Sequence, residues 1–459
     1  MPTIRTQRFG GIVPRLHPTL LPDEGASLAH NCILFNGKIV PIREPLQVAD
    51  MPIVLENGLT KIADAKTVYL WDRGFRKDIL AWPGVVHVSK SNLANDPRKR
   101  LFVSGETGFN NADEPCLYIS SLSGAEFTRH RLYKETLPAP VVTLDAYDPN
   151  KTIRYTSFFQ TWVDEFGYES GASLPGGTVT EGVNTEEVIY NDGQDVEIAS
   201  VAAPQGAVSR RIYKVVTGTE TEQIQFMAED KRLNEWLPKM NFTIKDEDAG
   251  EVIEHVTTIP RDLTSMVSVP GNFFAGFRRD MPREVCFSDM DRPTSWPDAF
   301  RYTIKDDAIA LAVAGNTVFV LTKRYPWAIT GTDPGGMAAS VIVSDQACVS
   351  PRSVCTMEGR VFYASQDGIC MLAEGSANAV LITRDYFSKT NWVALNPSTC
   401  LMNAYDGMLF AWFIDAGGIR RGYILSIGDG ISAVTTHDEY AKASFVDVET
   451  DGLYFVREV

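Results

Sequence analysis

The sequence predicts an all-β protein built around a β-propeller-like domain with an inserted β-sandwich. Three apolar hairpin-like units and a final single strand recur in the C-terminal half, at 316–331, 359–372, 407–427 and 451–459. The steps between them are 43, 48 and 44 residues when measured between equivalent points, Val318, Val361, Leu409 and Leu453. A period of this size, built from short strands, is typical of propeller blades. The strands are rich in Val, Tyr, Phe and Trp, which favour sheets.

The N-terminal part, residues 1–137, is expected to supply the first strands of the propeller-like domain. A short helix or turn over 23–30 precedes two strands that are joined at Asn36-Gly37. An Asn-Gly pair between apolar runs is the strongest short-range hairpin signal. Further strands are predicted at 67–72, 79–89, 100–105 and 116–120.

A change of rhythm near Pro138 and Pro140 marks a linker, because proline restricts its neighbours. Residues 138–258 then have the pattern of an immunoglobulin-like or fibronectin type III-like sandwich. Strands are predicted within 153–175 and at 196–201, 209–218 and 221–230, with a last strand and an exit loop in 231–256.

Residues 259–459 are expected to complete the propeller-like domain. Strands are predicted at 273–277 and 284–288, and the segment 306–322 begins the first regular unit. We expect the final strand to pair with N-terminal residues and close the ring, which would remove an exposed sheet edge.

Composition excludes several classes of protein. The chain has 43 Lys and Arg against 58 Asp and Glu, a formal charge of −15, whereas binding to a nucleic-acid backbone needs clustered cations. The basic run at 97–100 is interpreted as a solvated turn.

No apolar stretch is long enough to span a membrane, and the N-terminus lacks the apolar core of a secretory signal, so we expect synthesis in a cytoplasm. Seven cysteines without a C-x-x-C pair indicate buried thiols.

Asp289 and Asp291 are the best carboxylate pair in the sequence. Spacing of i, i+2 on a strand would put both on one face, as a propeller glycosidase would require. Pro293 and the flanking loop instead favour a solvated turn in which aspartate caps its own backbone. The acidic run 246–251 is likewise expected to be a turn, because it lacks the ligand spacing of a calcium loop.

Trp296 and Trp327 could form a carbohydrate platform, but large aromatic side chains on blades usually pack between blades, and we favour that interpretation. The six histidines are scattered singly. We therefore predict no catalytic, cofactor-binding or metal-binding residues, no cofactor and no enzyme activity.

Several segments together resemble the tail hub, or nozzle, proteins of short-tailed bacteriophages, of the tail tubular or DNA-stabilisation type. The resemblance rests on 9–45, on the sandwich stretches TWVDEFGYESGAS and RRIYKVVTG, and on 272–297 leading into 308–331. It covers most of the chain, and it depends on the order of these segments.

The resemblance implies a structural virion protein that assembles as a ring, typically a homohexamer, below the portal and its adaptor. Such a ring extends the DNA-ejection channel and anchors tail fibres or spikes. The expected partners are further copies of the chain, the portal-adaptor protein, the fibre or spike proteins, and double-stranded DNA that passes through the lumen without sequence recognition. The alternatives are a propeller glycosidase and a host-receptor-binding adhesin of a phage particle.

Overall fold

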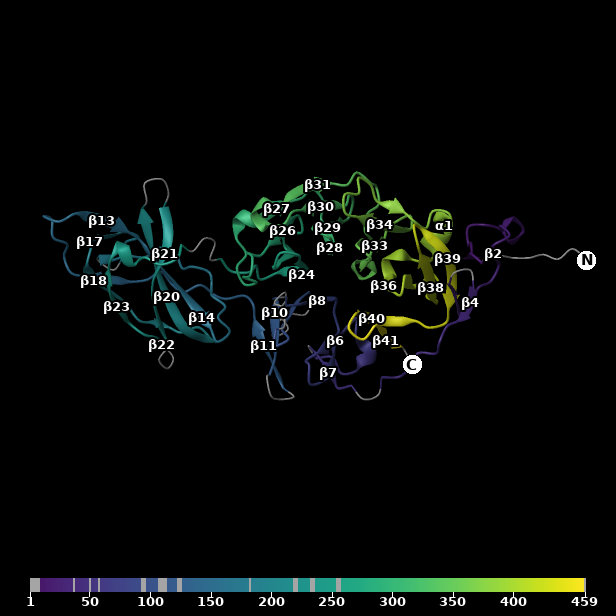
Figure 1. Cartoon of the computed structure of the whole chain (residues 1–459), viewed down its shortest axis with the longest axis horizontal. Coiled ribbons are helices and arrows are strands. Elements are labelled where there is room, and N and C mark those ends of the chain that lie inside the picture. The colour runs from purple at the N-terminus through teal and green to yellow at the C-terminus, as the bar shows by residue number, and fades with distance from the viewer. Residues whose placement is uncertain are drawn as a thin grey trace, which may run out of the picture. The chain divides into compact units, whose positions relative to one another are not determined.

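The regular secondary structure of the fold consists almost entirely of strands (Figure 1). The computed structural model describes residues 9–35, 38–48, 51–56, 58–91, 96–105, 114–121, 126–180, 183–217, 222–231, 236–252 and 257–457. Within these ranges α1 (Lys389–Ala394) is the only α-helix. The all-β prediction is confirmed. The chain divides into two compact units, the first containing 1–131, 261–286 and 301–459 and the second 132–260 and 287–300.

The first unit consists of small sheets that follow one another along the chain. Two four-stranded antiparallel sheets are β8 (Val86–Lys90), β9 (Leu101–Gly105), β10 (Cys116–Ser120), β11 (Phe127–Arg131), and β24 (Leu263–Val269), β25 (Phe273–Arg278), β26 (Glu284–Phe287), β27 (Arg301–Thr303). Two more are β28 (Ala308–Ala314), β29 (Thr317–Thr322), β30 (Trp327–Thr330), β31 (Ala338–Val341), and β32 (Cys355–Met357), β33 (Arg360–Ala364), β34 (Ile369–Ala373), β35 (Val380–Leu381).

The other sheets of this unit include the chain's beginning and end. The largest contains β36 (Leu401–Tyr405), β37 (Met408–Ile414), β38 (Arg420–Ile427), β39 (Ile431–His437), β1 (Gly11–Ile12) and β2 (Gly25–Ala26). The smaller ones are β5 (Ile53–Leu55), β7 (Lys77–Trp82), β6 (Thr67–Asp72), the pair β40 (Ala441–Asp447), β41 (Gly452–Arg457), and the hairpin β3 (Cys32–Phe35), β4 (Lys38–Pro41). Short 3₁₀ helices are η1 (Pro18–Leu20), η2 (Ile62–Asp64), η6 (Pro334–Gly336), η7 (Pro351–Ser353) and η8 (Pro397–Thr399).

These sheets are arranged in a closed ring. Strand β8 lies against β24, β24 against β28, β28 against β32, β32 against β36, β36 against β40, and β40 against β6. Buried Trp71, Trp82 and Tyr118 join the sheets of β6 and β8 and complete the circuit. All residues of β29 are buried, because neighbouring sheets cover both faces of the central strands. The arrangement is propeller-like.

The repeat read from the sequence corresponds to the second strand of successive sheets. Its four reference positions lie on β29, β33, β37 and β41. The three hairpin-like units are the antiparallel pairs β29–β30, β33–β34 and β37–β38. Glu358-Gly359 and Asp406-Gly407, which connect first and second strands, have positive φ at both positions, as type I′ hairpin turns require.

The predicted pairing of the last strand with N-terminal residues is wrong. Strand β41 pairs with β40, while Gly11 pairs in parallel with Val434 of β39. The turn between β40 and β41 is closed locally, because Asp447 accepts hydrogen bonds from the backbone N–H and hydroxyl of Thr450. A local hairpin loses less loop-closure entropy than pairing with the far end of the chain.

In the N-terminal region, β6 and β10 have the predicted bounds, and β9 begins one residue later than predicted. The single strand predicted at 79–89 is wrong, because that stretch contains β7 and β8, which are separated at 83–85 and belong to different sheets. The strands of the predicted hairpin are β3 and β4, and they pair as expected. Its turn, 36–37, lies outside the described residues. The segment 23–30 contains a turn and β2 rather than a helix.

The second unit has two three-stranded antiparallel sheets, β12 (Val142–Leu144), β18 (Gln194–Ile198), β23 (Met240–Ile244), and β14 (Phe158–Asp164), β20 (Ala207–Thr217), β21 (Glu222–Lys231). Three smaller pairs are β13 (Ile153–Thr156) with β17 (Val188–Asn191), β15 (Val179–Thr180) with β16 (Val183–Asn184), and β19 (Val201–Ala202) with β22 (Trp236–Leu237), and the 3₁₀ helices are η4 (Asp246–Asp248) and η5 (Asp298–Phe300). Val196, Phe158 and Ile212 belong to one buried cluster, so both three-stranded sheets contribute to a common core.

The boundaries of the second unit differ from those predicted at 138 and 258. It begins at Leu132, and it also includes 287–300, which the sequence had assigned to the propeller-like part. The unit begins before Pro138 and Pro140, because residues that precede these prolines belong to its core. Leu137 packs with Trp162 and Leu237 of this unit, and Lys134 forms an ion pair with Asp164.

Candidate interaction surface

The most unusual surface of the first unit is its N-terminal arm, by which we mean residues 9–48. Its exposed large apolar side chains are Phe9, Leu16, Leu20, Leu28, Ile39, Val40, Leu46 and Val48. Leu28 is 76% exposed and Leu46 is 92% exposed. Scattered apolar side chains are normal on a protein surface, but a concentration within one segment marks an interaction surface. The arm is therefore the candidate site of this unit.

The backbone of the arm is fixed although its side chains are exposed. Gly11 lies so close to β39 that a Cβ atom there would be 2.1 Å from the Val434 carbonyl oxygen, so only glycine fits. The Arg15 backbone N–H donates to the Tyr386 carbonyl at 2.9 Å. The arm is thus held on the sheet of β36–β39 and presents its apolar residues from it.

A polar cluster fastens the arm at His30 and Asn31. His30 Nε2 lies 2.9 Å from Asp438 Oδ1, and His30 Nδ1 lies 2.9 Å from Thr436 Oγ1. Asn31 Nδ2 donates to Asp438 Oδ2 at 2.7 Å. These bonds, first from Asn31 and then from His30, lower the pKa of Asp438 because they favour its charged form. The neighbouring His437 is buried, and desolvation lowers its pKa to about 4.

The order Thr436, His30, Asp438 is that of a nucleophile, a base and an orienting carboxylate. Asp438 is 73% exposed, however, so water competes for it. The Thr436 hydroxyl also donates to the Ala29 carbonyl at 3.3 Å, and that bond engages the proton a base would remove. We therefore interpret the cluster as an attachment of the arm. No local sequence pattern predicts this cluster, because its two sides lie about four hundred residues apart in the chain.

The second unit has exposed apolar side chains of its own. Tyr155 and Ile189 lie directly opposite each other on β13 and β17, and they are 55% and 36% exposed. Trp236, on β22, is 55% exposed. Exposed aromatic side chains are enriched where proteins bind partners. The pair Tyr155 and Ile189, and separately Trp236, are therefore further candidate contact residues, independent of the arm.

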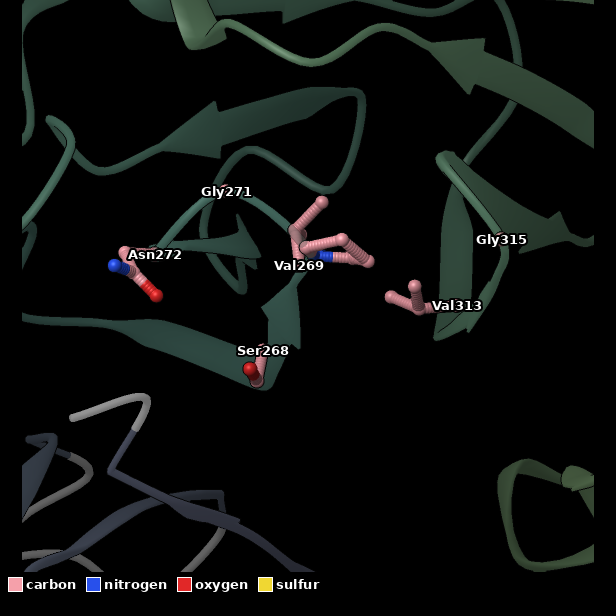
Figure 2. Close-up of a pocket in the computed structure, with 7 residues that line it drawn as sticks. Ser268, Val269, Gly271, Asn272, Val313 and Gly315 are labelled. Carbon is pink, nitrogen blue, oxygen red and sulfur yellow. The ribbon is translucent and has the colours of Figure 1, made fainter. Parts of the chain in front are cut away.

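A shallow cavity of about 490 Å³ lies between the β24–β25 turn and the end of β28 (Figure 2). Its lining is Ser268, Val269, Pro270, Gly271, Asn272, Val313 and Gly315. Figure 2 shows the Val269 and Val313 side chains on facing segments, and the Asn272 amide lies on the other side of Val269 from Val313. These seven residues include no acid, base or thiol, so they offer van der Waals contacts and neutral hydrogen-bonding groups, among them the Ser268 hydroxyl and the Asn272 amide.

The carboxylates predicted to lie in a turn do so. Asp289 Oδ1 accepts a hydrogen bond from the Met290 N–H at 2.9 Å, and the Asp289 N–H donates to the Ser295 carbonyl. Asp291 has φ of 58°, the left-handed conformation that aspartate adopts in turns. The two residues therefore do not share a strand face. The acidic run near 246 contains η4, and among the described residues no group of three or more His, Cys, Asp or Glu side chains is placed to hold a metal ion.

Trp296 is completely buried and donates from Nε1 to the Pro293 carbonyl, so it cannot be a platform. Trp327 is half-buried. The basic run at 97–100 is a turn, as predicted, in which Arg100 pairs with Asp96. All seven cysteines are thiols without a disulfide, and those at 116, 286, 348, 370 and 400 are buried. His255 lies outside the described residues.

Comparisons with known proteins do not assign a family. No family model and no curated protein matches the chain. Similar solved structures include Hsv2 of Kluyvelomyces marxianus, at 10% identity and a TM-score of 0.30, with 57% of this chain and 69% of that chain covered. An acylaminoacyl peptidase of Pyrococcus horikoshii has 7% identity, a TM-score of 0.28, and coverage of 86% and 50%. The extracellular domain of a one-component system from B. thetaiotaomicron has 10% identity, a TM-score of 0.29, and coverage of 92% and 58%.

Likenesses at these scores carry no argument about activity or partners. Among the residues that the structure describes, no helix has the length and apolar character needed to cross a membrane.

Proposed function

We propose that the chain is a structural protein of a bacteriophage tail, which assembles with further copies of itself into the ring of a nozzle or hub. The observation that carries this proposal is the apolar arm. A protein that acts alone gains nothing from holding Leu28, Val40 and Leu46 in water, whereas an assembly subunit buries such residues against its neighbours. The order of the segments that resemble phage nozzle proteins supports the same assignment.

In this proposal the ring is a homohexamer that extends the DNA-ejection channel below the portal and its adaptor. Each copy has a formal charge of −15, which would repel the phosphates of exiting DNA and limit adhesion. Double-stranded DNA is then cargo and not a recognised ligand. The protein would be assembled in the host cytoplasm and would reside in the virion.

We also propose that the second unit is a fibronectin type III-like sandwich that contacts fibres, spikes or other tail proteins. Its common core between two antiparallel three-stranded sheets supports the sandwich assignment. Its exposed Tyr155 and its exposed Trp236 are each candidate contact residues for such partners.

The proposal is tested by symmetry and location. Electron microscopy of purified protein and of virions should show a ring of copies at the tail, and mass spectrometry of purified virions should detect the chain. A protein that is monomeric at every concentration and absent from virions would rule the proposal out.

A host-binding adhesin is a second candidate, and the exposed Trp236 favours it. Fluorescently labelled protein should then bind host cells, and Trp236→Ala should reduce that binding. If wild type and variant are equally unable to bind cells, the adhesin function is excluded. A glycosidase has no comparable support, because Asp289 and Asp291 lie in a turn.

A further inference from the structure

The docked part of the arm, residues 9–42, is attached to two short segments of the first unit. Among the described residues, all its hydrogen bonds and ion pairs to the rest of the chain are made with 384–386 or with 426–438. The longer of these segments contains the end of β38 and all of β39. Because its polar contacts are confined to so small a part of the unit, the arm can leave without disturbing the other sheets.

A connecting segment, residues 43–48, joins the docked part to β5, which lies in the sheet of β6 and β7 (Figure 1). All six of its residues are exposed, and none of them forms a hydrogen bond or an ion pair with another described residue. Pro41 and Pro45 hold the residues before them in extended conformations. The connecting segment is therefore extended and unattached, as the hinge of an exchangeable element must be.

The face of the sheet beneath β3 contains two buried polar atoms without a partner. The register of β38 and β39 puts Ser426, Thr435 and His437 on one face. The Ser426 hydroxyl donates to the Leu34 carbonyl at 3.2 Å, so β3 lies on that face. Thr435 Oγ1 and His437 Nε2 are buried and have no hydrogen-bond partner among the described residues. Burying polar groups without partners costs free energy, so this covering of the face is weaker than its apolar contacts alone would make it.

We propose that the arm is exchanged between copies of this chain, so that residues 9–42 of one copy dock on β38 and β39 of the next. The contacts are the same as those within a single chain, so exchange loses none of them. Exchange also places the connecting segments between copies, where Leu46 and Val48, which are 92% and 40% exposed in the single chain, become buried. This burial favours the exchanged form.

Exchange in one direction produces a ring. The arm and the face of β38 and β39 are different surfaces, so each copy can give its arm to one neighbour and receive an arm from the other. Such a heterologous contact closes into a ring when its rotation allows. The chain from 43 to 52 spans at most about 35 Å when fully extended, so the neighbours must touch each other. The inference rests on the proposed ring-forming function and names the contact that forms the ring.

The experiment asks which chain supplies the arm on a given body. Arg15 Nη1 lies 3.9 Å from Asp385 Oδ1, and both side chains are exposed. One full-length variant carries Arg15→Cys and the other Asp385→Cys, and both carry Cys32→Ser, which removes the native thiol of the arm. The two are co-expressed, purified and treated with a short bismaleimide. Neither chain contains both sites, so a crosslinked peptide that joins positions 15 and 385 can form only between copies.

With exchange, random assembly puts an Arg15→Cys arm on an Asp385→Cys body in about a quarter of the contacts. A covalent dimer should therefore appear on denaturing gels, with the 15–385 peptide in its mass spectrum. A chain that carries both substitutions should form covalent multimers. The matched control is the pair Asp307→Cys and Lys323→Cys, because Lys323 Nζ lies 3.1 Å from Asp307 Oδ2 within one sheet. The co-expressed control variants should give no such dimer. Circular dichroism and thermal unfolding establish that all variants are folded.

The chain with both substitutions also supplies the result that would overturn the inference, namely crosslinks only within single chains. If mass photometry shows rings of that same protein, the proposed function stands without arm exchange. A doubly substituted chain without any 15–385 crosslink would show that the arm is not docked, and would also overturn the inference. Exchanged dimers of a protein that is absent from virions would support the inference and reject the proposed function.

Discussion

His30 Nε2 lies 2.9 Å from Asp438 Oδ1, although 408 positions separate the two residues. The other carboxylate oxygen accepts from Asn31, so adjacent residues of the arm hold both oxygens of one aspartate. Backbone bonds accompany this contact, because the Asn31 N–H donates to the Thr436 carbonyl. The arm is therefore attached by side chains as well as by strand pairing, and the strength of the attachment can be tested separately from assembly.

We expect Asp438→Ala to loosen the arm without unfolding the first unit. The change removes the acceptor for both His30 and Asn31, so amide hydrogen exchange over 25–35 should become roughly fivefold faster, while exchange in β33 and β37 stays unchanged. Hydrogen-exchange mass spectrometry measures both regions. Asp429→Ala, an exposed change in the β38–β39 turn, should have no effect. Equal exchange in Asp438→Ala and wild type would show that strand pairing alone holds the arm.

The second unit contains an ion pair that should contribute strongly to its stability. Lys134 Nζ lies 2.6 Å from Asp164 Oδ2, and the two side chains are only 5% and 10% exposed. Burial lowers the pKa of Lys134, and Asp164 opposes that shift. Lys134→Ala leaves a buried carboxylate without its cation, so the free energy of unfolding should fall by about 3 kcal/mol in urea titrations.

Lys239→Ala is the matched control, because Lys239 pairs with Glu197 at the surface, where the side chains are 53% and 36% exposed. Its loss should cost less than about 1 kcal/mol. Equal effects of the two substitutions would show that burial does not strengthen the Lys134 pair.

The sequence predicted strands well wherever local pattern decides structure. The bounds of β6 and β10 follow from apolar runs between turns, and the four repeat positions fall on equivalent strands. The prediction of strand pairing failed where contacts between distant parts of the chain determine which strands pair. The residues adjacent to Gly11 in the sequence do not indicate that it pairs with Val434. The residues adjacent to Leu453 do not indicate that its strand pairs with β40 and not with the N-terminus. Which strand edges pair depends on how the sheets of the first unit pack into their ring.

The interaction surfaces could not be predicted for a related reason. The exposure of a side chain depends on how the whole chain folds. Ile39 and Val40 belong to an apolar run of the kind found in buried strands, but all four residues of β4 are exposed. Similarly, the contact of His30 with Asp438 joins residues that each look solitary in the sequence. The turn at Asp289 was predictable, because proline and aspartate determine turn conformation locally.

The buried cysteines should be unreactive while the protein is folded. Burial raises the pKa of Cys116, Cys286 and Cys348 to about 12 and that of Cys370 to about 11, so the reactive thiolate is scarce at neutral pH. Iodoacetamide should label these four only after denaturation, as measured by peptide mass spectrometry. Cys32, which is half-buried in the arm, should be labelled earlier than they are. Rapid native labelling of Cys348 would indicate that its sheet opens.

Lys214 should make the stability of the second unit depend on pH. The side chain is fully buried on β20, with Nζ 3.5 Å from the Tyr190 hydroxyl, and desolvation lowers its pKa from 10.5 to about 8. Between these two values the unfolded chain binds more protons than the folded one, so the free energy of unfolding should rise with pH across this window. Lys214→Met removes the charge and keeps most of the volume, so it should stabilise the unit at neutral pH by about 1 kcal/mol and abolish that rise. Urea titrations from about pH 7 to about pH 9.5 compare the two proteins over the range in which only this group differs between them. Parallel curves for wild type and variant would mean that Lys214 keeps its charge and its hydration in the folded unit.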